Sequence, residues 1–278
     1  MKETRAEHLA VEKLRPFEGH PFKVVDNEEM DQLTWSILTQ GLLTPLVVRP
    51  LPNGEYEVIS GHRRLHACKK AGIETVPALI YAIDRDAAAI ALVDSNLQRE
   101  HILPSEKAFA YKLKLEAMNH QGRTSGQVGQ KWTRDEIAEG ESGRQVQRYI
   151  RLTNLIPGIL QKVDEGRIAL TPAVELSYLT DAEQEDLLET MESEDCTPSL
   201  SQAIQMKALS QSGQLDMDTI FHIMTQPKAN QQEKISFKVS ELRDFFPRHY
   251  TAAQMMQEIK VALKERQQRL ARQRDHSR

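Results

Sequence analysis

The first segment of this chain with residue types suited to chemistry is Gly61-His62-Arg63-Arg64. A β-rich run, residues 56–59, stops just before it, and a helix-favouring run, residues 65–71, follows and ends at Gly72. A strand, a glycine turn and a helix start bring free backbone N–H groups and the positive end of a helix dipole to one point. Guanidinium groups add fixed charge there and suit phosphate oxygens. The segment predicts an anion site, although an ordinary basic first helical turn remains an alternative.

A second candidate site is a helix that begins at the pattern Ser142-x-x-Gln145, nine residues after Thr133-x-x-Glu136. Two capping boxes at this spacing predict two short helices in a helix-turn-helix. Apolar residues of the second helix recur at helical spacing, and its arginines fall on the opposite face, as a major-groove recognition helix requires. A merely solvated basic face is the alternative. The residues predicted to contact DNA are Ser142, Arg144, Gln145, Gln147, Arg148 and Arg151.

No metal site is predicted. His62 and His66 are four residues apart, a spacing that can chelate a metal on a helix, but no third ligand clusters with them. Cys68 and Cys196 are far apart and have no metal or redox spacing, so we expect reduced thiols.

Short strands and helices are expected before residue 100, and they position the predicted anion site at residues 61–64. We expect a polar, frayed stretch over residues 1–10, an extended piece at 13–17, and a helix from a capping box at Asp26 to Gly41. Strands are expected at 46–49, 56–59 and 76–81, and Pro77 predicts that the last lies at a sheet edge. Asp84 should cap a helix that runs to about Ser95.

Helices are expected over most of the rest of the chain. A helix from Leu103 to about Asn119 precedes a Gly- and Ser-rich loop at 121–131. After the helix-turn-helix, the predicted helices span 159–165, 172–179 with Thr171 as cap, 181–192, 200–211 and 217–225, and a last one opens at Thr251. Residues 235–239 alternate and suggest a brief strand or an extended link.

Composition agrees with helix-rich modules of more than one domain. The chain has 278 residues, 27% charged and 5% aromatic, and a formal net charge of −4. That charge argues against a uniformly basic nucleic-acid coat, so DNA binding must come from local patches. No apolar run approaches membrane-spanning length and the polar N-terminus is no signal peptide, so we expect a cytoplasmic protein.

Several segments, in order, resemble the ParB/RepB/Spo0J-like partition proteins. Residues 41–49, GLLTPLVVR, are similar to the family's first nucleotide motif, and Gly61-His62-Arg63-Arg64 is similar to its arginine box. Asn96-Leu97-Gln98-Arg99-Glu100 resembles its third motif, and residues 146–152 with 163–166 resemble its helix-turn-helix. The resemblance covers roughly residues 12–180. The remainder looks like the tail of relatives on mobile elements of Gram-positive bacteria.

The resemblance implies a CTP-gated, DNA-binding protein of plasmid, mobile-element or chromosome partition, with Mg²⁺ beside the nucleotide. It implies an α+β fold: a small mixed α/β nucleotide-binding domain at 1–120, a helix-turn-helix domain at 121–180 and a helical region at 181–278 that serves in dimerisation. The implied partners are double-stranded DNA, a second copy of the chain and a ParA-type ATPase, with a location on the nucleoid or a plasmid and no membrane. The implied nucleotide-binding residues are Thr44, Gly61, His62, Arg63, Arg64, Asn96 and Arg99.

The chain departs from the family pattern at two positions that matter for chemistry. His62 stands where the arginine box usually has Glu, and Ser95 stands where an acidic residue usually precedes the Asn of the third motif. In relatives that carboxylate assists hydrolysis, so its absence weakens water activation and metal support. We therefore expect nucleotide binding and leave weak CTP hydrolysis open. In addition, residues 138–142 form a turn about two residues shorter than the family's.

Two other classes of function compete with the partition protein. One is a transcriptional regulator with a vestigial nucleotide domain, which would bind DNA regardless of nucleotide. The other is a nuclease or kinase on the same N-terminal fold, since a fold does not fix chemistry.

Overall fold

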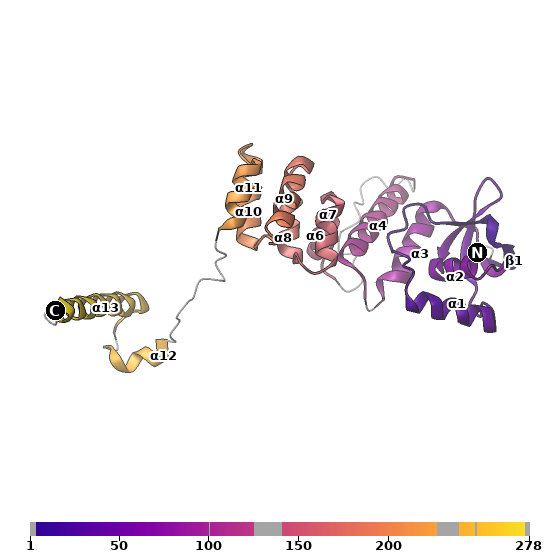
Figure 1. Ribbon diagram of the computed structural model, residues 1–278. Helices are drawn as coiled ribbons and strands as arrows, with labels where there is room; N and C mark the ends of the chain where they lie inside the picture. The colour runs from indigo at the N-terminus through magenta and orange to yellow at the C-terminus, as the bar shows by residue number, and fades with distance from the viewer. Residues whose placement is uncertain (1–3, 100, 125–140, 227–238, 248, 276–278) are drawn as a thin grey trace. The chain divides into compact units, whose positions relative to one another are not determined.

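The structure, a computed structural model, describes residues 4–99, 101–124, 141–226, 239–247 and 249–275. It contains two compact units, Met1–Gln226 and Pro227–Arg278, which are described separately (Figure 1). The first unit opens with a five-stranded sheet and continues as helices. The predicted α+β fold, a small mixed α/β domain followed by helical segments, is confirmed.

The sheet is mixed and has the strand order β1-β5-β3-β4-β2. β1 pairs antiparallel with β5 and β3 with β4, whereas β2 with β4 and β3 with β5 are parallel pairs. A short 3-10 turn, Val11–Lys13, separates the first two strands. In chain order the strands are β1 (Thr4–Ala10), β2 (Leu14–Pro16), β3 (Leu46–Pro50), β4 (Tyr56–Ser60) and β5 (Thr75–Tyr81).

Two predictions about the strands were wrong, and they share one cause. The stretch expected to fray forms β1, which pairs with β5 from Thr4 to Ala10, with His8 opposite Pro77. β5 is therefore an interior strand, although its proline predicted an edge. Arg5, Ala6 and His8 are exposed and only Leu9 is buried among the β1 side chains whose burial is described, so the sequence carries little hydrophobic pattern there. Its backbone hydrogen bonds, which any sequence can make, hold it in place.

Helices cover both faces of the sheet, because successive residues of a strand point to opposite sides. Val58 packs in one core cluster with residues of α1 (Glu28–Gln40) and α2 (His62–Lys70). Ile59, the next residue of β4, packs in another with residues of α3 (Arg85–Leu97) and α4 (Pro104–Thr124). The loop between β4 and α2 thus starts from a strand that is buried on both faces.

Helix boundaries differ from the predicted ones by a few residues. The cap of α1 is Asn27, whose side chain accepts from the Met30 N–H, and not Asp26. Asp84 caps α3 as predicted, but the helix runs to Leu97, so Asn96 lies in its last turn. α4 continues to Thr124, into the segment expected to be a loop, and residues 125–131 lie outside the described residues.

The described residues of the first unit after α4, 141–226, form helices and have their own core. Thr180 with Glu183 and Ser199 with Gln202 form reciprocal capping boxes at the starts of α9 and α10. α8 begins at Leu170 after Ala169, so the prediction that Thr171 caps it was wrong. The helix expected from Thr133 lies outside the described residues. The helices are α6 (Gly143–Arg151), α7 (Pro157–Asp164), α8 (Leu170–Leu176), α9 (Asp181–Ser193), α10 (Leu200–Gln211) and α11 (Met217–Thr225), with a 3-10 turn at Leu152–Asn154.

α4 connects the two parts of the first unit. It packs against α3 and also against α6 and α7. Its Ala110 belongs to the core beside the sheet, and its Ala108 belongs to the core of the later helices. The predicted boundaries at residues 120 and 180 stay a prediction, since in the structure everything from β1 to α11 forms one unit.

The described residues of the second unit contain α12 (Val239–Leu242), a 3-10 turn at Arg243–Phe245, and α13 (Ala252–Asp275). Thr251 and Gln254 exchange the predicted capping hydrogen bonds at the start of α13. Of the expected link at 235–239, Val239 begins α12 and residues 235–238 are outside the described ranges. Among the described helices, none combines the length and apolar character needed to cross a bilayer.

Candidate functional site

The loop between β4 and α2 is built around Gly61. Its φ is 104°, a left-handed conformation that side chains other than glycine disfavour. A Cβ at this position would lie 2.6 Å from Leu46 Cδ2 and 3.1 Å from Arg64 Nη2, so there is also no space for one. No side chain caps α2. The first N–H groups of the helix are therefore available to an anionic ligand.

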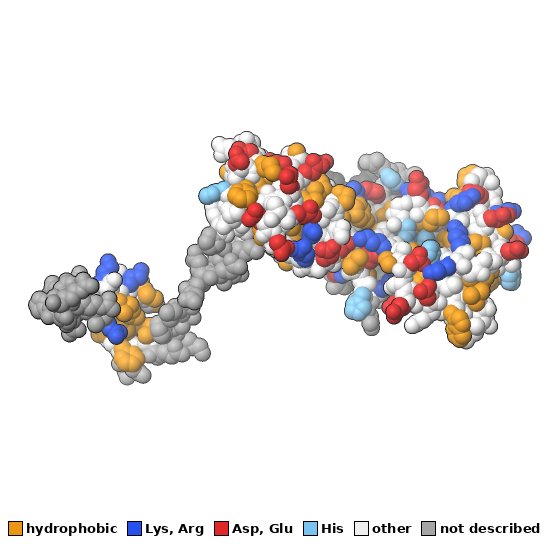
Figure 2. Space-filling model, viewed as in Figure 1, with side chains coloured by type: hydrophobic (Ala, Val, Ile, Leu, Met, Phe, Trp, Pro, Cys, Tyr) orange, Lys and Arg blue, Asp and Glu red, His pale blue; other side chains and the backbone are white. Residues whose placement is uncertain are grey.

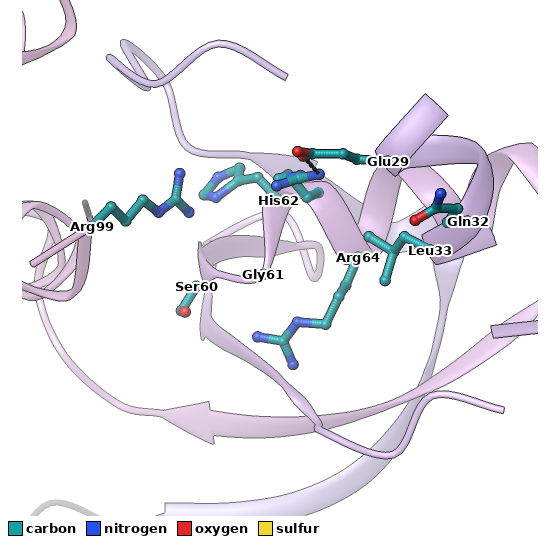
Figure 3. A pocket seen from close by; sticks show the side chains of 9 residues that line it. Glu29, Gln32, Leu33, Ser60, Gly61, His62, Arg64 and Arg99 are labelled. Carbon is teal, nitrogen blue, oxygen red and sulfur yellow. Dashed lines mark hydrogen bonds and ion pairs between the residues drawn. The ribbon is translucent and has the colours of Figure 1, made fainter. Parts of the chain in front are cut away.

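A cavity of about 510 Å³ opens at this loop (Figure 3). Five residues predicted to bind the nucleotide meet there, namely Gly61, His62, Arg63, Arg64 and Arg99. Arg99 follows α3 and reaches the loop from a different side than Arg64 does. The cavity wall also includes Ser60 and, from α1, Glu29, Gln32 and Leu33.

The two adjacent arginines have different partners. Arg63 Nη2 lies 3.0 Å from Glu29 Oε2, and both side chains are exposed. Arg64 is half-buried and its Nη1 donates to the carbonyl oxygens of Thr44, at 2.5 Å, and Pro45, at 2.9 Å. Burial lowers the pKa of Arg64 below its usual value. Arg64 therefore holds the segment that contains Thr44 in addition to lining the cavity. Thr44 itself, although predicted to bind the nucleotide, is not among the residues that line the cavity, and its backbone carbonyl oxygen is what contacts Arg64.

Arg99 brings a third guanidinium to the cavity. Its Cζ lies 5.6 Å from the centroid of the Phe22 ring, which is buried. Burial, followed by repulsion from Arg63, lowers the pKa of Arg99. Like charges that face one cavity are costly without an anion between them, so this arrangement favours a ligand of high negative charge.

His62 is neutral and structural in this arrangement. Its Nε2 accepts a hydrogen bond from the Phe17 N–H at 3.2 Å, and its ring stacks on that of His20 with centroids 3.7 Å apart. Burial lowers the pKa of His62 to about 3 and that of His20 to about 4. His62 therefore fixes the segment that begins at Phe17 and adds no positive charge to the cavity at neutral pH.

The structure does not bring Asn96 to the cavity. This side chain is only 5% exposed, and its Nδ2 donates to the Leu92 carbonyl oxygen at 2.7 Å within α3. Ser95 Oγ donates to the same oxygen at 2.9 Å. The polar side chains of Ser95 and Asn96 are thus hydrogen-bonded within their own helix.

No metal site is evident in the part of the chain that the structure describes. No three His, Cys, Asp or Glu side chains there lie close enough to hold an ion. His66, one of the two histidines at chelating spacing, has its Nε2 3.1 Å from Asp26 Oδ1. The other, His62, uses its Nε2 to accept the Phe17 N–H.

The predicted DNA-binding helix is α6, and Ser142 caps it by accepting from the Gln145 N–H at 3.3 Å. Val146 is buried, and Tyr149 and Ile150 pack against the core clusters as the spacing predicts. On the polar face, Arg144 is exposed and Gln147 is partly exposed. The Gln145 side chain does not complete a capping box but accepts from Arg148 Nη1 at 3.2 Å. The assignment of these residues to DNA stays a prediction.

The sequence prediction did not include four residues of the cavity wall: Ser60, which directly precedes Gly61, and Glu29, Gln32 and Leu33 of α1. Two contacts that shape the cavity were also missed: Glu29 pairs with Arg63 across 34 positions, and Phe22, outside the wall, lies under Arg99. Neither has a signal in local spacing, because α1 and the segment after β2 reach the cavity only through the tertiary fold.

Comparison with known proteins places the chain among partition proteins. The family model described as the ParB N-terminal domain matches residues 1–97. The probable chromosome-partitioning protein ParB of Vibrio cholerae is 30% identical over 238 residues, which cover 84% of this chain and 77% of that protein. Other curated relatives match over smaller shares of their own length, between 39% and 61%.

Two crystal structures of the C-terminally truncated chromosome-partitioning protein ParB from Caulobacter crescentus are also similar. The one complexed to the centromeric parS site has 24% identity, a TM-score of 0.42, and coverage of 74% of this chain and 99% of that chain. The one complexed with CTP-γ-S has 26% identity, a TM-score of 0.32, and coverage of 68% and 99%.

Proposed function

Since the chain belongs to the ParB family of chromosome-partitioning proteins, we propose that it binds a nucleoside triphosphate at the start of α2 and duplex DNA along α6. The nucleotide is CTP by family resemblance. The observation that carries the nucleotide part is the convergence of Arg63, Arg64 and Arg99 on the cavity beside Gly61. Three guanidiniums and the free N–H groups of a helix start offset the charge of a polyphosphate.

Binding rather than turnover is the chemistry that these residues support. The side chains of Ser95 and Asn96 donate hydrogen bonds to the Leu92 carbonyl oxygen. Glu29, the carboxylate in the cavity wall, forms an ion pair with Arg63. A general base must be free to accept a proton from the attacking water. The described residues do not assemble a metal site of their own, so Mg²⁺ would be held mainly by the nucleotide's phosphates, where it neutralises charge.

DNA binding by α6 is supported by charge and by exposure. Arg144 projects from the first turn of α6, where recognition helices contact base edges and phosphates. By contrast, residues 181–195 contain no Lys or Arg and many carboxylates. Figure 2 shows acidic side chains gathered over the α9–α11 part of the visible face. That region repels phosphates, so DNA should approach the α6 side.

The proposal includes the assembly and location that the family resemblance implies. The chain acts as a homodimer whose two copies read two half-sites, meets a ParA-type ATPase, and resides on the nucleoid or on a plasmid. The narrower assignment, to the branch carried by mobile elements of Gram-positive bacteria, is tested by deletion of the coding sequence from such an element. Loss of the element from dividing cells, measured without selection, is the expected result.

Titration of the purified chain with CTP, ATP and GTP tests the nucleotide site. We expect CTP to bind, and Arg63→Ala to weaken it by about 10- to 100-fold, the loss of one or two charge-assisted hydrogen bonds. Arg64→Ala should weaken CTP binding similarly and also lower the melting temperature, because the Thr44 and Pro45 carbonyl oxygens lose their donor. Arg5→Ala, which removes the same charge from β1, is the control.

Glu29→Gln sharpens the test. It removes the carboxylate that occupies Arg63 in the absence of ligand, so CTP affinity should stay constant or rise. Failure of all three nucleotides to bind, together with intact duplex binding, would favour the nucleotide-independent transcriptional regulator instead. Metal-dependent cleavage of DNA or phosphorylation of a small molecule would favour the nuclease or kinase.

A further inference from the structure

Two of the arginines expected on the DNA-facing side of α6 are engaged within the protein. Arg148 Nη2 donates to Thr171 Oγ1 of α8 at 2.6 Å. Arg151 Nη2 donates to the carbonyl oxygen of Ser177, the residue that follows α8, at 3.0 Å. The middle and the end of α6 are therefore tied to the start and the end of α8.

Arg151 also belongs to a stack that reaches α10. Its Cζ lies 3.8 Å from the centroid of the Tyr178 ring, and Lys207 Nζ of α10 lies 3.8 Å from the same centroid. Lys207 in turn pairs with Glu175 Oε2 of α8 at 2.8 Å. The cation–π attraction between a cation and an aromatic face is stronger when the cation is partly desolvated. One tyrosine ring thus connects the last turn of α6 with α8 and α10.

The Arg151 guanidinium is not available to a phosphate in this arrangement. Its Nε is buried and, among the described residues, has no hydrogen-bond partner. A buried donor left unpaired is costly, and such a group is tolerated where the surrounding contacts fix its position. Extension toward DNA would break both the Ser177 hydrogen bond and the Tyr178 stack. Arg144 differs, since it is exposed and no hydrogen bond or ion pair joins it to another described residue.

We propose that Arg151 and Tyr178 are positioning residues that set the tilt of α6 against α8, and that Arg144 is a direct DNA contact. This inference rests on the proposed function, because it assumes that α6 reads DNA. Contacts with base edges require a fixed helix orientation, whereas non-specific attraction to phosphates requires only charge. Loss of a positioning residue should therefore reduce discrimination between DNA sequences and leave the number of phosphate contacts unchanged.

The experiment compares full-length variants on two duplexes, one selected from a random pool by the wild-type protein and one with its sequence scrambled. Affinities are measured at several salt concentrations, and the slope of log K against log salt counts phosphate contacts. For Arg144→Ala we expect a slope smaller in magnitude by about 0.9, as for one lost phosphate contact. For Arg151→Met we expect an unchanged slope and a ratio of specific to scrambled affinity lower by about tenfold, the loss of one good base contact.

Tyr178 provides the second variant and the conservative control. Tyr178→Leu removes the ring and should reproduce the Arg151→Met result, whereas Tyr178→Phe keeps the ring and should retain wild-type discrimination. If Arg151→Met does not fold, as judged by its melting curve, the two Tyr178 variants decide the question.

Two outcomes would overturn the inference. One is a slope for Arg151→Met that falls as it does for Arg144→Ala, which would make Arg151 a phosphate contact. The other is unchanged discrimination in Tyr178→Leu. Failure of the wild-type protein to select any duplex would instead defeat the proposed function.

Discussion

At the scale of single residues, the sequence predicted the part of the site that is contiguous in the chain. Gly61, Arg63 and Arg64 were assigned because their types and order suit an anion loop, and the structure brings them to one cavity. Arg99 was assigned through family resemblance and also lies there. Asn96 was assigned in the same way, but its burial in α3 depends on how that helix packs. A motif reports which residue types are present and not which of them face the ligand.

His62 leads to a prediction about pH. Its pKa is lowered to about 3, and that of His20 to about 4, mainly by burial, so the native state holds both rings neutral. The unfolded chain binds their protons near pH 6.5, so stability is full above that value and falls as pH drops toward the native values. Between pH 7 and 5 we expect a loss of roughly 2–3 kcal/mol for the pair, with the His20 part halved for its partial exposure.

Melting curves at several pH values measure this effect. His62→Gln cannot titrate but keeps an oxygen that can accept the Phe17 N–H, so its melting temperature should depend less steeply on pH than that of the wild type. His8→Gln changes an exposed histidine of β1 and should keep the wild-type slope. Equal slopes in all three proteins would show that His62 does not cause the acid sensitivity.

At the scale of elements, local patterns predicted the strands β3, β4 and β5 and most helices, although the caps expected at Asp26 and Thr171 were wrong. Asp84, Thr180 and Ser199 cap the helices for which sequence patterns indicated starts, because capping involves side chains within one turn. β1 was missed because its pairing partner is about 70 positions away and its own pattern is polar. The same missing strand made the Pro77 prediction wrong. Non-local pairing is the information that a local pattern does not contain.

The packing of α3 on α4 includes an ion pair with unequal burial. Lys114 Nζ donates to Asp94 Oδ1 at 2.6 Å, and the side chains are 5% and 35% exposed respectively. Asp94→Ala leaves a buried ammonium without a partner and should destabilise the first unit by about 2–4 kcal/mol. Lys114→Met removes the buried charge, leaves a carboxylate that water can reach, and should cost less than about 1 kcal/mol.

Urea unfolding followed by circular dichroism tests this asymmetry through the shift of the midpoint. The double variant Asp94→Ala/Lys114→Met should resemble Lys114→Met alone, because the unpaired charge is then absent. A Lys114→Met variant as unstable as Asp94→Ala would contradict the argument.

At the scale of the whole molecule, the sequence predicted an α/β part followed by helices but not what joins them. Residues of the two parts meet at Asp164, the last residue of α7, whose side chain is 8% exposed. Asp164 accepts from the Ser105 N–H at 2.9 Å and from Ser105 Oγ at 2.6 Å, and it pairs with Lys23 Nζ at 3.1 Å. A carboxylate of α7 thus caps the start of α4.

The same contacts extend back to the cavity. Lys23 also donates its N–H to Glu106 Oε1 of α4 at 2.8 Å, and its neighbour Phe22 lies under Arg99. A ligand that repositions Arg99 would therefore shift Phe22 and its neighbour Lys23, which pairs with Asp164. Coupling between the two sites is measured as a change in the affinity for one ligand caused by the other.

Asp164→Asn provides that measurement, within the proposed function. The amide is uncharged and has only one oxygen, so it cannot accept from the Ser105 N–H, Ser105 Oγ and Lys23 Nζ as the carboxylate does. We therefore expect the factor by which CTP changes duplex affinity to fall several-fold. CTP affinity without DNA should stay within about twofold, because Asp164 is not among the residues that line the cavity.

In the wild type, DNA must change CTP affinity by the same factor as CTP changes DNA affinity. Asp181→Asn, an equal charge change at the exposed start of α9, is the control. An undiminished factor in Asp164→Asn would show that the two sites communicate by a route other than this contact.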